Sequence, residues 1–503
     1  MKTILTGAIV AALAAAANPA AAQFPVSGRP VPLFSEIDNK IQTLMQTNGI
    51  DAGVVGINRG ERTIYLRSFG WLEKPVILTG FPPTVIFPGI NLPETAMFRV
   101  ASVTKLITAA AVHAMAEDNL LGNAGLNRKA FNMPGNGGIL LVVPFGGLGD
   151  ADYDDITISH LLGHAGGFRR GDDPYNDLRQ VATDLNTLSP PTLYEIMRWR
   201  LGRMLADTPG AQSQINQMGV DPYSNFGYNV LGSIVELAPG GYDSYVRNRV
   251  FGASNWIPNG DWAHGRTFLA DRHPREPRYQ STGTNDEADN IYDNDLPYEK
   301  VPPPYGGFSM ESGFYAGGMI SSAQAMLRFG ALYHVGYRAP STSSAVIHNI
   351  GSRNTPTNPP RDDFHTGGFA GTCSILDRSE SEDGTSENDT VIFIAFAKSA
   401  PSGTGYESLA LAEVKSVLTA LELNADTVWP TAECDGFWVK PGSLGPSGRG
   451  GYQDEYTSFA HAQATVTDGS KLQLKAGSSP WTGTITKRLE LKAPEGPFTI
   501  GTP

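Results

Sequence analysis

The stretch FRVASVTKLITAAAVHAM, residues 98–115, is almost wholly apolar and yet carries one lysine, Lys105. An apolar run of this length predicts a buried helix, and a buried ammonium group is costly unless it is paired or neutral. Ser102 precedes Lys105 by three residues, so on a helix their side chains lie one turn apart on the same face. The pair is therefore either a nucleophile with its activating amine, or a serine helix cap beside an unrelated lysine.

Two further motifs follow in the chain. Tyr223-Ser224-Asn225 lies in DPYSNFGYNVLGSIVE, where a Tyr-x-Asn loop runs into an apolar helix, and His365-Thr366-Gly367 begins a glycine-rich strand. A serine hydroxyl is a poor nucleophile and needs a neighbouring base. A helix N-terminus and partial desolvation both lower the pKa of a lysine, which favours its neutral form. The three motifs together therefore favour nucleophilic catalysis over a serine cap.

In this order the three motifs resemble the serine β-lactamase and penicillin-binding-protein superfamily, on the class C side. Further segments match: ITISHLLGHAGGF, TPG at 208–210, and FYAGGMISSAQAMLRF. The resemblance covers roughly residues 33–423. It implies an α+β fold with an antiparallel sheet flanked by helices and a mostly helical lobe, and it implies a serine hydrolase.

The resemblance also implies a role for each matching residue. Ser102 is the expected nucleophile, and Lys105 either accepts its proton or keeps Tyr223 ionised. Tyr223 is the expected proton shuttle to the leaving group, and later the base that activates the deacylating water. Asn225 is expected to hold Lys105 and the acyl-side carbonyl of the substrate.

The third motif contributes a strand edge to the predicted site. Thr366 and Gly367 are expected to bind substrate, and Gly368 to share an oxyanion hole with Ser102 through their backbone N–H groups. Class C β-lactamases usually have Lys-Thr-Gly here, but position 365 is histidine. His-Thr-Gly resembles the DD-peptidase and D-aminopeptidase branches, and a neutral histidine is a weaker anchor for a substrate carboxylate.

The predicted function is therefore an exported serine hydrolase that forms an acyl-enzyme on Ser102. It is expected to hydrolyse small esters or amides, as a carboxylesterase or D-amino-acid peptidase does. A β-lactamase or acyltransferase of the same fold is the alternative within the family. A non-catalytic binding or scaffold protein is the alternative from another class. If the apolar loop FNMPGNGGILLVVPFGGLG, 131–149, borders the cleft, it would favour a bulky or hydrophobic acyl group.

Periodicity predicts the arrangement of the main domain, residues 23–424. Residues 33–49 have apolar side chains at helical spacing, and a hairpin is expected around Asn58-Arg59-Gly60-Glu61. Strands are expected within 365–377 and 390–398, followed by an amphipathic helix over 406–423. Strands from both ends of the chain are predicted to share one antiparallel sheet, with a helical lobe inserted between them.

Residues 425–503 form a β-rich C-terminal extension. Short strands such as KLQLKA, GTITK and LELKA alternate with Gly and Pro turns. They resemble the opening rungs of a right-handed parallel β-helix, or form a β-rich tail of no named type. Too few rungs are present for a stable solenoid, so the extension is expected to pack on the main domain. Cys373 and Cys434 are either one disulfide or two unpaired buried thiols.

Residues 1–22 have the lysine, apolar run and small-residue end of a secretory signal peptide, which predicts a periplasmic or extracellular protein. No later segment has the roughly 20 apolar residues of a membrane span. The net charge of −12 argues against nucleic acid as a partner. The expected partner is a small-molecule ester, amide or peptide, and the oligomeric state is left open.

Neither a cofactor nor a metal is expected. His160 and His164 are four residues apart in HLLGH, a spacing that could suit zinc. The glutamate that a hydrolytic zinc helix carries after its first histidine is replaced by Leu161, and no third ligand is evident. Both histidines are therefore predicted to be structural.

Overall fold

The computed structural model describes residues 24–60, 62–78, 84–211, 222–252, 260–283, 286–335, 362–381, 388–401, 404–422, 429, 436–441, 455–466, 470–494 and 496–501. The predicted signal peptide and Cys434 lie outside these residues.

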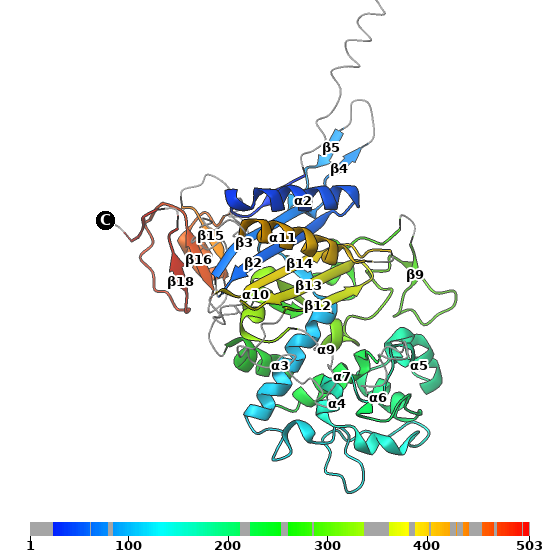
Figure 1. Ribbon diagram of the computed structural model, residues 1–503. Helices are drawn as coiled ribbons and strands as arrows, with labels where there is room; N and C mark the ends of the chain where they lie inside the picture. Colours follow the sequence, from blue (N-terminus) through cyan, green and yellow to red (C-terminus); the bar gives the residue numbers. More distant parts are fainter. Residues whose placement is uncertain are drawn as a thin grey trace, which may run out of the picture.

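A seven-stranded antiparallel sheet forms the centre of the molecule (Figure 1). Its order is β1-β3-β2-β14-β13-β12, with β6 beside β3. The predicted hairpin is formed, and β2 pairs with β14, so strands from both ends of the chain share the sheet as expected. The strands are β1 (Val26–Ser27), β2 (Ala52–Arg59), β3 (Arg62–Glu73), β6 (Ile90–Asn91), β12 (Asp362–Phe369), β13 (Thr372–Ser379) and β14 (Thr390–Phe396).

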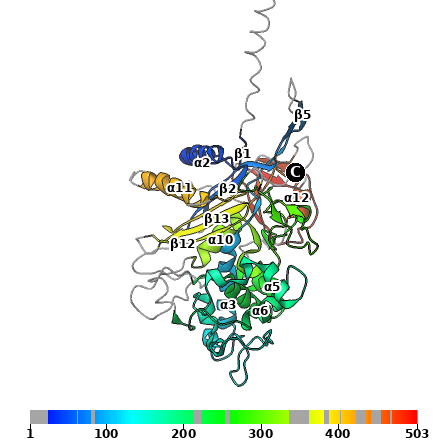
Figure 2. The same ribbon diagram turned by 90° about the vertical axis from the view of Figure 1, so that its right-hand side faces the viewer.

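Helices cover both faces of the sheet. The predicted terminal helices, α2 (Ser35–Thr47) and α11 (Tyr406–Glu422), lie side by side on one face, and α10 (Ala323–Leu332) lies on the other (Figures 1 and 2). The apolar side chains of β14 alternate between the two resulting cores, because successive residues of a strand point to opposite faces. The sheet is buried on both sides, which explains why β14 reads as a continuous apolar run.

The predicted helical lobe lies beyond the α10 face of the sheet (Figure 1). Helix α3 runs from the sheet into this lobe, and most of its side chains are buried, as the apolar run requires. The helices of the lobe are α3 (Thr104–Glu117), α4 (Ile158–Leu162), α5 (Leu178–Leu185), α6 (Leu193–Leu201), α7 (Asn225–Val235) and α8 (Gly241–Tyr245). The fold class expected from the sequence is confirmed.

Smaller elements lie outside the central sheet. A three-stranded antiparallel sheet has the order β7-β11-β8, and two short hairpins are formed by β4 with β5 and by β9 with β10. These elements and the nearby α9 are β4 (Val76–Leu78), β5 (Thr84–Phe87), β7 (Met97–Arg99), β8 (Trp262–His264), β9 (Ala288–Asp289), β10 (Lys300–Val301), α9 (Phe314–Gly317) and β11 (Met319–Ser322). Strand β7 matters most here, because it leads directly to Ser102.

The C-terminal extension contains parallel strand pairs, the arrangement that stacked rungs require. β15 (Phe437–Val439), β16 (Lys471–Leu474) and β18 (Glu490–Lys492) pair in parallel, as do β17 (Gly477–Ser479) and β19 (Phe498–Ile500). The helix α12 (Phe459–Thr465) packs against β15 within a small apolar core. Arg275 Cζ lies 5.4 Å from the centroid of the Phe437 ring. The extension therefore contacts the main domain at this point. The division of the chain at residue 424 stays a prediction.

Cys373 is a free, buried thiol. Its Sγ donates a hydrogen bond to the Lys398 carbonyl at 3.3 Å, and burial raises the pKa of the thiol well above its usual value. Of the two alternatives expected for Cys373, a disulfide or an unpaired buried thiol, the structure has the unpaired thiol.

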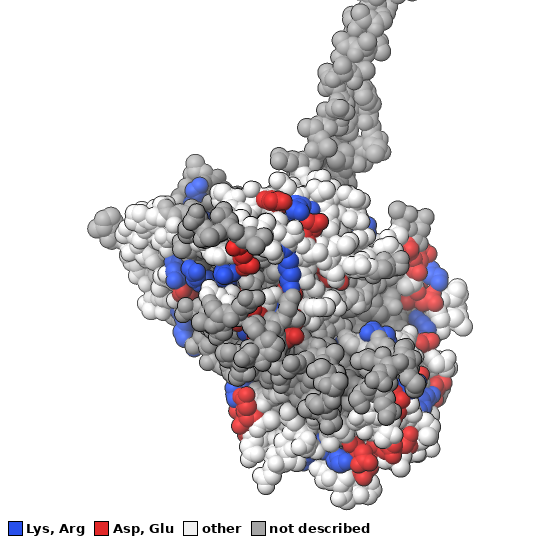
Figure 3. Space-filling view, viewed as in Figure 1, with Lys and Arg blue, Asp and Glu red and all other residues white. Residues whose placement is uncertain are grey.

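Acidic and basic side chains are interspersed over the face shown in Figure 3. Among the residues that the structure describes, no helix is both long enough and apolar enough to span a membrane.

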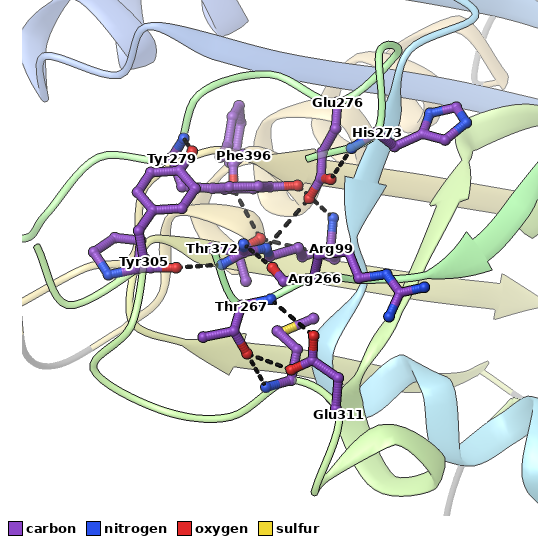
Figure 4. Close-up of polar contacts among 12 residues, drawn as sticks. Arg99, Arg266, Thr267, His273, Glu276, Tyr279, Tyr305, Glu311, Thr372 and Phe396 are labelled. Atoms are coloured by element: carbon purple, nitrogen blue, oxygen red, sulfur yellow. Dashed lines mark hydrogen bonds and ion pairs between the residues drawn. The ribbon is translucent and has the colours of Figure 1, made fainter. Parts of the chain in front are cut away.

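A buried ion pair fixes the strand that leads to Ser102. The side chains of Arg99 and Glu276 are 0% and 1% exposed, and Arg99 Nε lies 3.2 Å from Glu276 Oε1 (Figure 4). The guanidinium also donates to the carbonyl oxygens of Pro304 at 2.7 Å and Arg266 at 2.8 Å. Two buried charges are tolerated here because the guanidinium donates hydrogen bonds to the carboxylate and to both carbonyl oxygens.

Further polar contacts hold the backbone of the same strand. The Arg99 N–H donates to the Tyr279 hydroxyl at 2.7 Å, and the Thr372 hydroxyl donates to the Arg99 carbonyl at 3.0 Å (Figure 4). In the segment that packs on this network, the Met310 N–H donates to the Thr267 hydroxyl at 2.9 Å. Strand β7, the sheet and the segment around Met310 are thereby fixed to one another.

We expect Glu276→Gln to lower the free energy of unfolding by about 3 kcal/mol, because it leaves a buried guanidinium without its carboxylate. Urea unfolding followed by circular dichroism measures the change. Asp289→Asn is the matched control, since the Asp289–Lys300 pair is largely exposed and should contribute little. Equal stability of the two variants would contradict the importance of the buried pair.

Candidate active site

Ser102 lies at the turn between a strand and a helix. The short helix η2 (Ala101–Val103) joins β7 to α3, and Ala101 has φ of 45°, a left-handed conformation that is uncommon for alanine. The residues that precede η2 and α3 are Val100 and Val103, and neither makes a side-chain cap. Ser102 is therefore not the cap of either helix, and it lines the cleft.

Lys105 is completely buried behind Ser102. Its Nζ lies 2.7 Å from Asn225 Oδ1, 2.6 Å from the Ala316 carbonyl oxygen and 3.3 Å from Ser102 Oγ. Burial is the main cause that holds the pKa of Lys105 well below its usual range; Asp173 opposes the shift and Arg170 adds to it. A neutral amine has two N–H donors, which the two shorter contacts use. Its lone pair then remains for the Ser102 hydroxyl proton.

Tyr223 lies beside this amine, in the loop before α7. Lys105 Nζ is 4.7 Å from the centroid of the Tyr223 ring. The Arg170 guanidinium carbon lies 4.3 Å from the same centroid, and the His164 ring lies 4.5 Å away. Tyr223 and Asn225 both line the cleft with Ser102, although more than a hundred residues separate them in the chain. The structure thus brings the first two sequence motifs together.

Asp173 holds the loop that carries Tyr223 and Asn225, a role that was not expected from the sequence. Its buried carboxylate accepts hydrogen bonds from the N–H groups of Asn225 at 2.6 Å and Phe226 at 3.0 Å, at the N-terminus of α7. Burial raises the pKa of Asp173, and these backbone N–H groups oppose the rise. A carboxylate at this end of a helix is favoured by the helix dipole. Asp173-Pro174 could have indicated a turn, but nothing local relates it to a loop fifty residues later.

His365 is buried on β12. Its Nδ1 lies 2.8 Å from the carbonyl oxygen of Thr366. Burial, and then the Lys105 charge, lower the pKa of His365 to about 3. The imidazole is therefore neutral at ordinary pH and supplies no fixed positive charge. Thr366 is exposed and does not line the cleft, whereas Gly368 does.

Gly367 allows β12 to pass directly beside η2. A Cβ atom on Gly367 would lie 2.2 Å from the Val100 carbonyl oxygen and 2.9 Å from the Ser102 backbone N. Neither distance is possible for a real carbon atom, so only glycine permits this approach. On Gly368, a Cβ would meet one atom, the Thr372 carbonyl oxygen at 3.9 Å. The backbone of β12 is thereby held against the backbone of Ser102.

The cleft above Ser102 has a volume of about 230 Å³. One wall comes from the helical lobe and the other from β12 and the segment before α9. An aromatic pair, Phe308 and Phe369, lies in the second wall with ring centroids 4.8 Å apart. The lining residues are Ser102, Arg170, Tyr175, Leu178, Tyr223, Asn225, Phe308, Ser309, Met310, Gly313, Ala316, Gly317, Gly318, Gly368 and Phe369.

The loop 131–149 contributes none of the residues that line this cleft, so the condition under which it would favour a bulky acyl group is not met. Phe131 and Leu140 pair through a bridge and are buried in the core of the lobe. Leu141 and Val143, by contrast, are exposed on the surface. The apolar residues of the loop are divided between core and surface, which its sequence does not reveal.

His160 and His164 have separate structural contacts. His160 forms a capping box with Thr157 at the start of α4, while the Ser224 N–H donates to His164 Nδ1 at 3.2 Å. His164 also has φ of 55°, so the helix has already ended before it. Within the described residues no cluster of three possible metal ligands is found.

A family model described as Beta-lactamase matches residues 37–403. The chain belongs to the β-lactamase family. As a member of this family it is a serine hydrolase, in agreement with the resemblance of its motifs.

Several solved structures share similarity with this β-lactamase family chain. One is D-amino acid amidase from Ochrobactrum anthropi SV3 with D-phenylalanine, at 19% identity and a TM-score of 0.49, covering 77% of this chain and 99% of the other. EstCE1, described as a hydrolase with promiscuous acyltransferase activity, has 17% identity, a TM-score of 0.46 and coverages of 77% and 98%. Beta-lactamase/D-alanine carboxypeptidase from Yersinia pestis has 16% identity, a TM-score of 0.45 and coverages of 77% and 98%. Similarities at this level do not identify a substrate.

We expect Gly367→Ala to lower kcat/KM by about 100-fold, because β12 must move away from Ser102 to accommodate the methyl group. Hydrolysis of p-nitrophenyl butyrate, with circular dichroism as a check on folding, measures the effect. Gly368→Ala is the control and should lose far less kcat/KM, because a Cβ at this position would meet its nearest atom at an ordinary contact distance of 3.9 Å. An equal loss in both variants would contradict the steric argument.

Proposed function

We propose that the chain is an exported serine hydrolase that forms an acyl-enzyme on Ser102 and hydrolyses small esters or amides. The observation that carries this proposal is the environment of Lys105. Two acceptors occupy its N–H groups, burial disfavours its ammonium form, and Ser102 Oγ lies 3.3 Å away. A lysine so placed is suited to take the serine proton.

In the acylation step, Ser102 Oγ attacks the carbonyl carbon of the substrate while its proton passes to Lys105, directly or through Tyr223. The carbonyl electron pair moves to oxygen, and the backbone N–H groups of Ser102 and Gly368 stabilise this oxyanion. Tyr223 then delivers the proton to the leaving group as its bond to the carbonyl carbon breaks. The products are the free alcohol or amine and an ester on Ser102.

In the deacylation step, water attacks the ester on Ser102, and Tyr223 with Lys105 accepts a proton from that water. Collapse of the second oxyanion breaks the bond to Ser102 Oγ, which takes the proton back. An alcohol in place of water would give acyl transfer with the same residues. This is why hydrolysis and transfer remain alternatives within one mechanism.

The lining of the cleft supports a small substrate with an apolar portion. Leu178 and Met310 lie on opposite walls, and the Phe308–Phe369 pair adds an aromatic surface. A neutral His365 in place of lysine argues against a β-lactam carboxylate as the native requirement. A carboxylesterase or D-amino-acid peptidase therefore ranks before a β-lactamase. A non-catalytic scaffold ranks last, because the catalytic side chains are all present: Ser102 and Tyr223 line one cleft, and Lys105 lies buried within 3.3 Å of Ser102 Oγ.

We expect Ser102→Ala to reduce ester hydrolysis by at least roughly 1,000-fold, because no other group replaces the nucleophile. A fluorophosphonate probe followed by peptide mass spectrometry should add one adduct, on Ser102. A panel of p-nitrophenyl esters, D-alanyl peptides and nitrocefin then ranks the substrate classes. An adduct elsewhere, or full activity in Ser102→Ala, would overturn the proposed function.

A further inference from the structure

We propose that Arg170 is a positioning residue that supplies the fixed positive charge of this active site, acting through Tyr223 and Lys105. The inference rests on the proposed function and concerns how its proton acceptor is kept ready to react. In relatives with Lys-Thr-Gly a lysine stands at the strand position that His365 occupies here. Arg170 comes from another element, the short helix η5 (Arg170–Asp172), on the opposite wall of the cleft.

The geometry places the guanidinium on the Tyr223 ring. Arg170 Cζ is 4.3 Å from the ring centroid, within the range of a cation–π contact, and Lys105 Nζ is 4.7 Å from the same centroid. The position of η5 is secured a few residues later by Asp173, whose carboxylate is bound to the start of α7. Because that helix start also carries Asn225, Arg170 and the catalytic loop are held by one buried group.

The other charged or titratable groups around Tyr223 do not fill this role. His164, after α4, and His365, on β12, both have pKa values lowered chiefly by burial, so both are neutral. Asp173 is an acid whose carboxylate is bound by backbone N–H groups. Lys105, on α3, exchanges a proton during the reaction. Among the described groups that face Tyr223, Arg170 is the one whose positive charge is independent of pH.

The adjacent arginine has a different environment. Arg169 makes two contacts with Asp207, from Nε at 2.8 Å and from an Nη at 2.7 Å. It does not line the cleft, and no ring contact between Arg169 and Tyr223 is found in the described structure. Substitutions of the two neighbouring arginines therefore form a matched pair. Each removes one positive charge, but only Arg170 contacts the Tyr223 ring.

The Arg170 charge shifts the pKa of the catalytic base in the same direction whether Lys105 or Tyr223 takes the proton. A fixed cation disfavours a second cation, so it lowers the pKa of Lys105 and increases the neutral fraction. The same cation favours a phenolate over a phenol, so it also increases the ionised fraction of Tyr223. Removing the charge therefore makes the base harder to deprotonate in either case. The acidic limb of the pH–rate profile must then move to higher pH.

The test is the pH dependence of kcat/KM for the full chain with a neutral ester, p-nitrophenyl butyrate. Arg170→Gln should move the acidic limb up by about 0.5–1 pH unit and lower kcat/KM on that limb about 3–10-fold, with recovery on the alkaline plateau. Arg170→Lys should restore most of the wild-type profile. Arg169→Gln should leave the limb in place.

A second substrate separates a role in proton transfer from a role in binding. The hemisuccinate ester of p-nitrophenol carries a carboxylate on its acyl part. If Arg170→Gln loses activity only toward this anionic ester and the limb for the neutral ester stays in place, Arg170 is a substrate anchor and the proposal is overturned. An unmoved limb with both esters overturns it as well. Wild-type protein without Ser102-dependent hydrolysis would instead refute the proposed function, so the two failures are distinguishable.

Discussion

A buried amine between two parts of the fold is the constraint on which the site depends. Lys105 is on α3, but the oxygens that hold it come from α7 and α9, through Asn225 and Ala316. The amine can be buried only if these elements converge, and their convergence also forms the cleft. Packing of α3, α7 and α9 against one another and creation of the proton acceptor are therefore one event, because no one of these helices alone would desolvate the lysine.

The strand before Ser102 is secured by a different kind of interaction. The Arg99–Glu276 pair and its carbonyl partners fix β7 from the side of the segment that contributes Met310 to the cleft. Helix α3 meanwhile holds Ser102 from the other side. The left-handed conformation of Ala101 lies between these two anchors, and such a conformation persists where its surroundings determine it strongly. The nucleophile is thus positioned by contacts distributed over both halves of the main domain.

Patterns with a short period could be predicted from the sequence. The hairpin, the terminal helices, the strands of the shared sheet and the apolar helix after Ser102 all follow from local alternation or helical spacing. The alignment of Ser102, Lys105, Tyr223 and Asn225 was expected because their order matches a family pattern. The orientation of these side chains is what the structure adds, notably the three contacts of the lysine.

Contacts between distant segments could not be predicted in this way. Asp173 and Arg170 act on a loop fifty residues later, and Glu276 pairs with an arginine far before it in the chain. Their local sequences look like solvated acidic and basic surface. Only the fold buries Asp173 and Glu276 and brings the exposed Arg170 onto the Tyr223 ring. The loop 131–149 shows the opposite case, since its apolar residues are compatible with a cleft wall although they are divided between core and exterior.

The absence of a side chain at Gly367 has a consequence for how the site tolerates mutation. Because β12 and η2 meet main chain to main chain, the groups proposed to receive the oxyanion have no rotamers to search and no side-chain atoms to lose. Replacement of Ser102 or Gly368 by any residue except proline preserves the N–H itself. Substitutions in the surrounding sequence can therefore change which substrates the cleft accepts, while the two backbone N–H groups stay in place. A family built on such a contact can diversify its substrates without rebuilding its oxyanion hole.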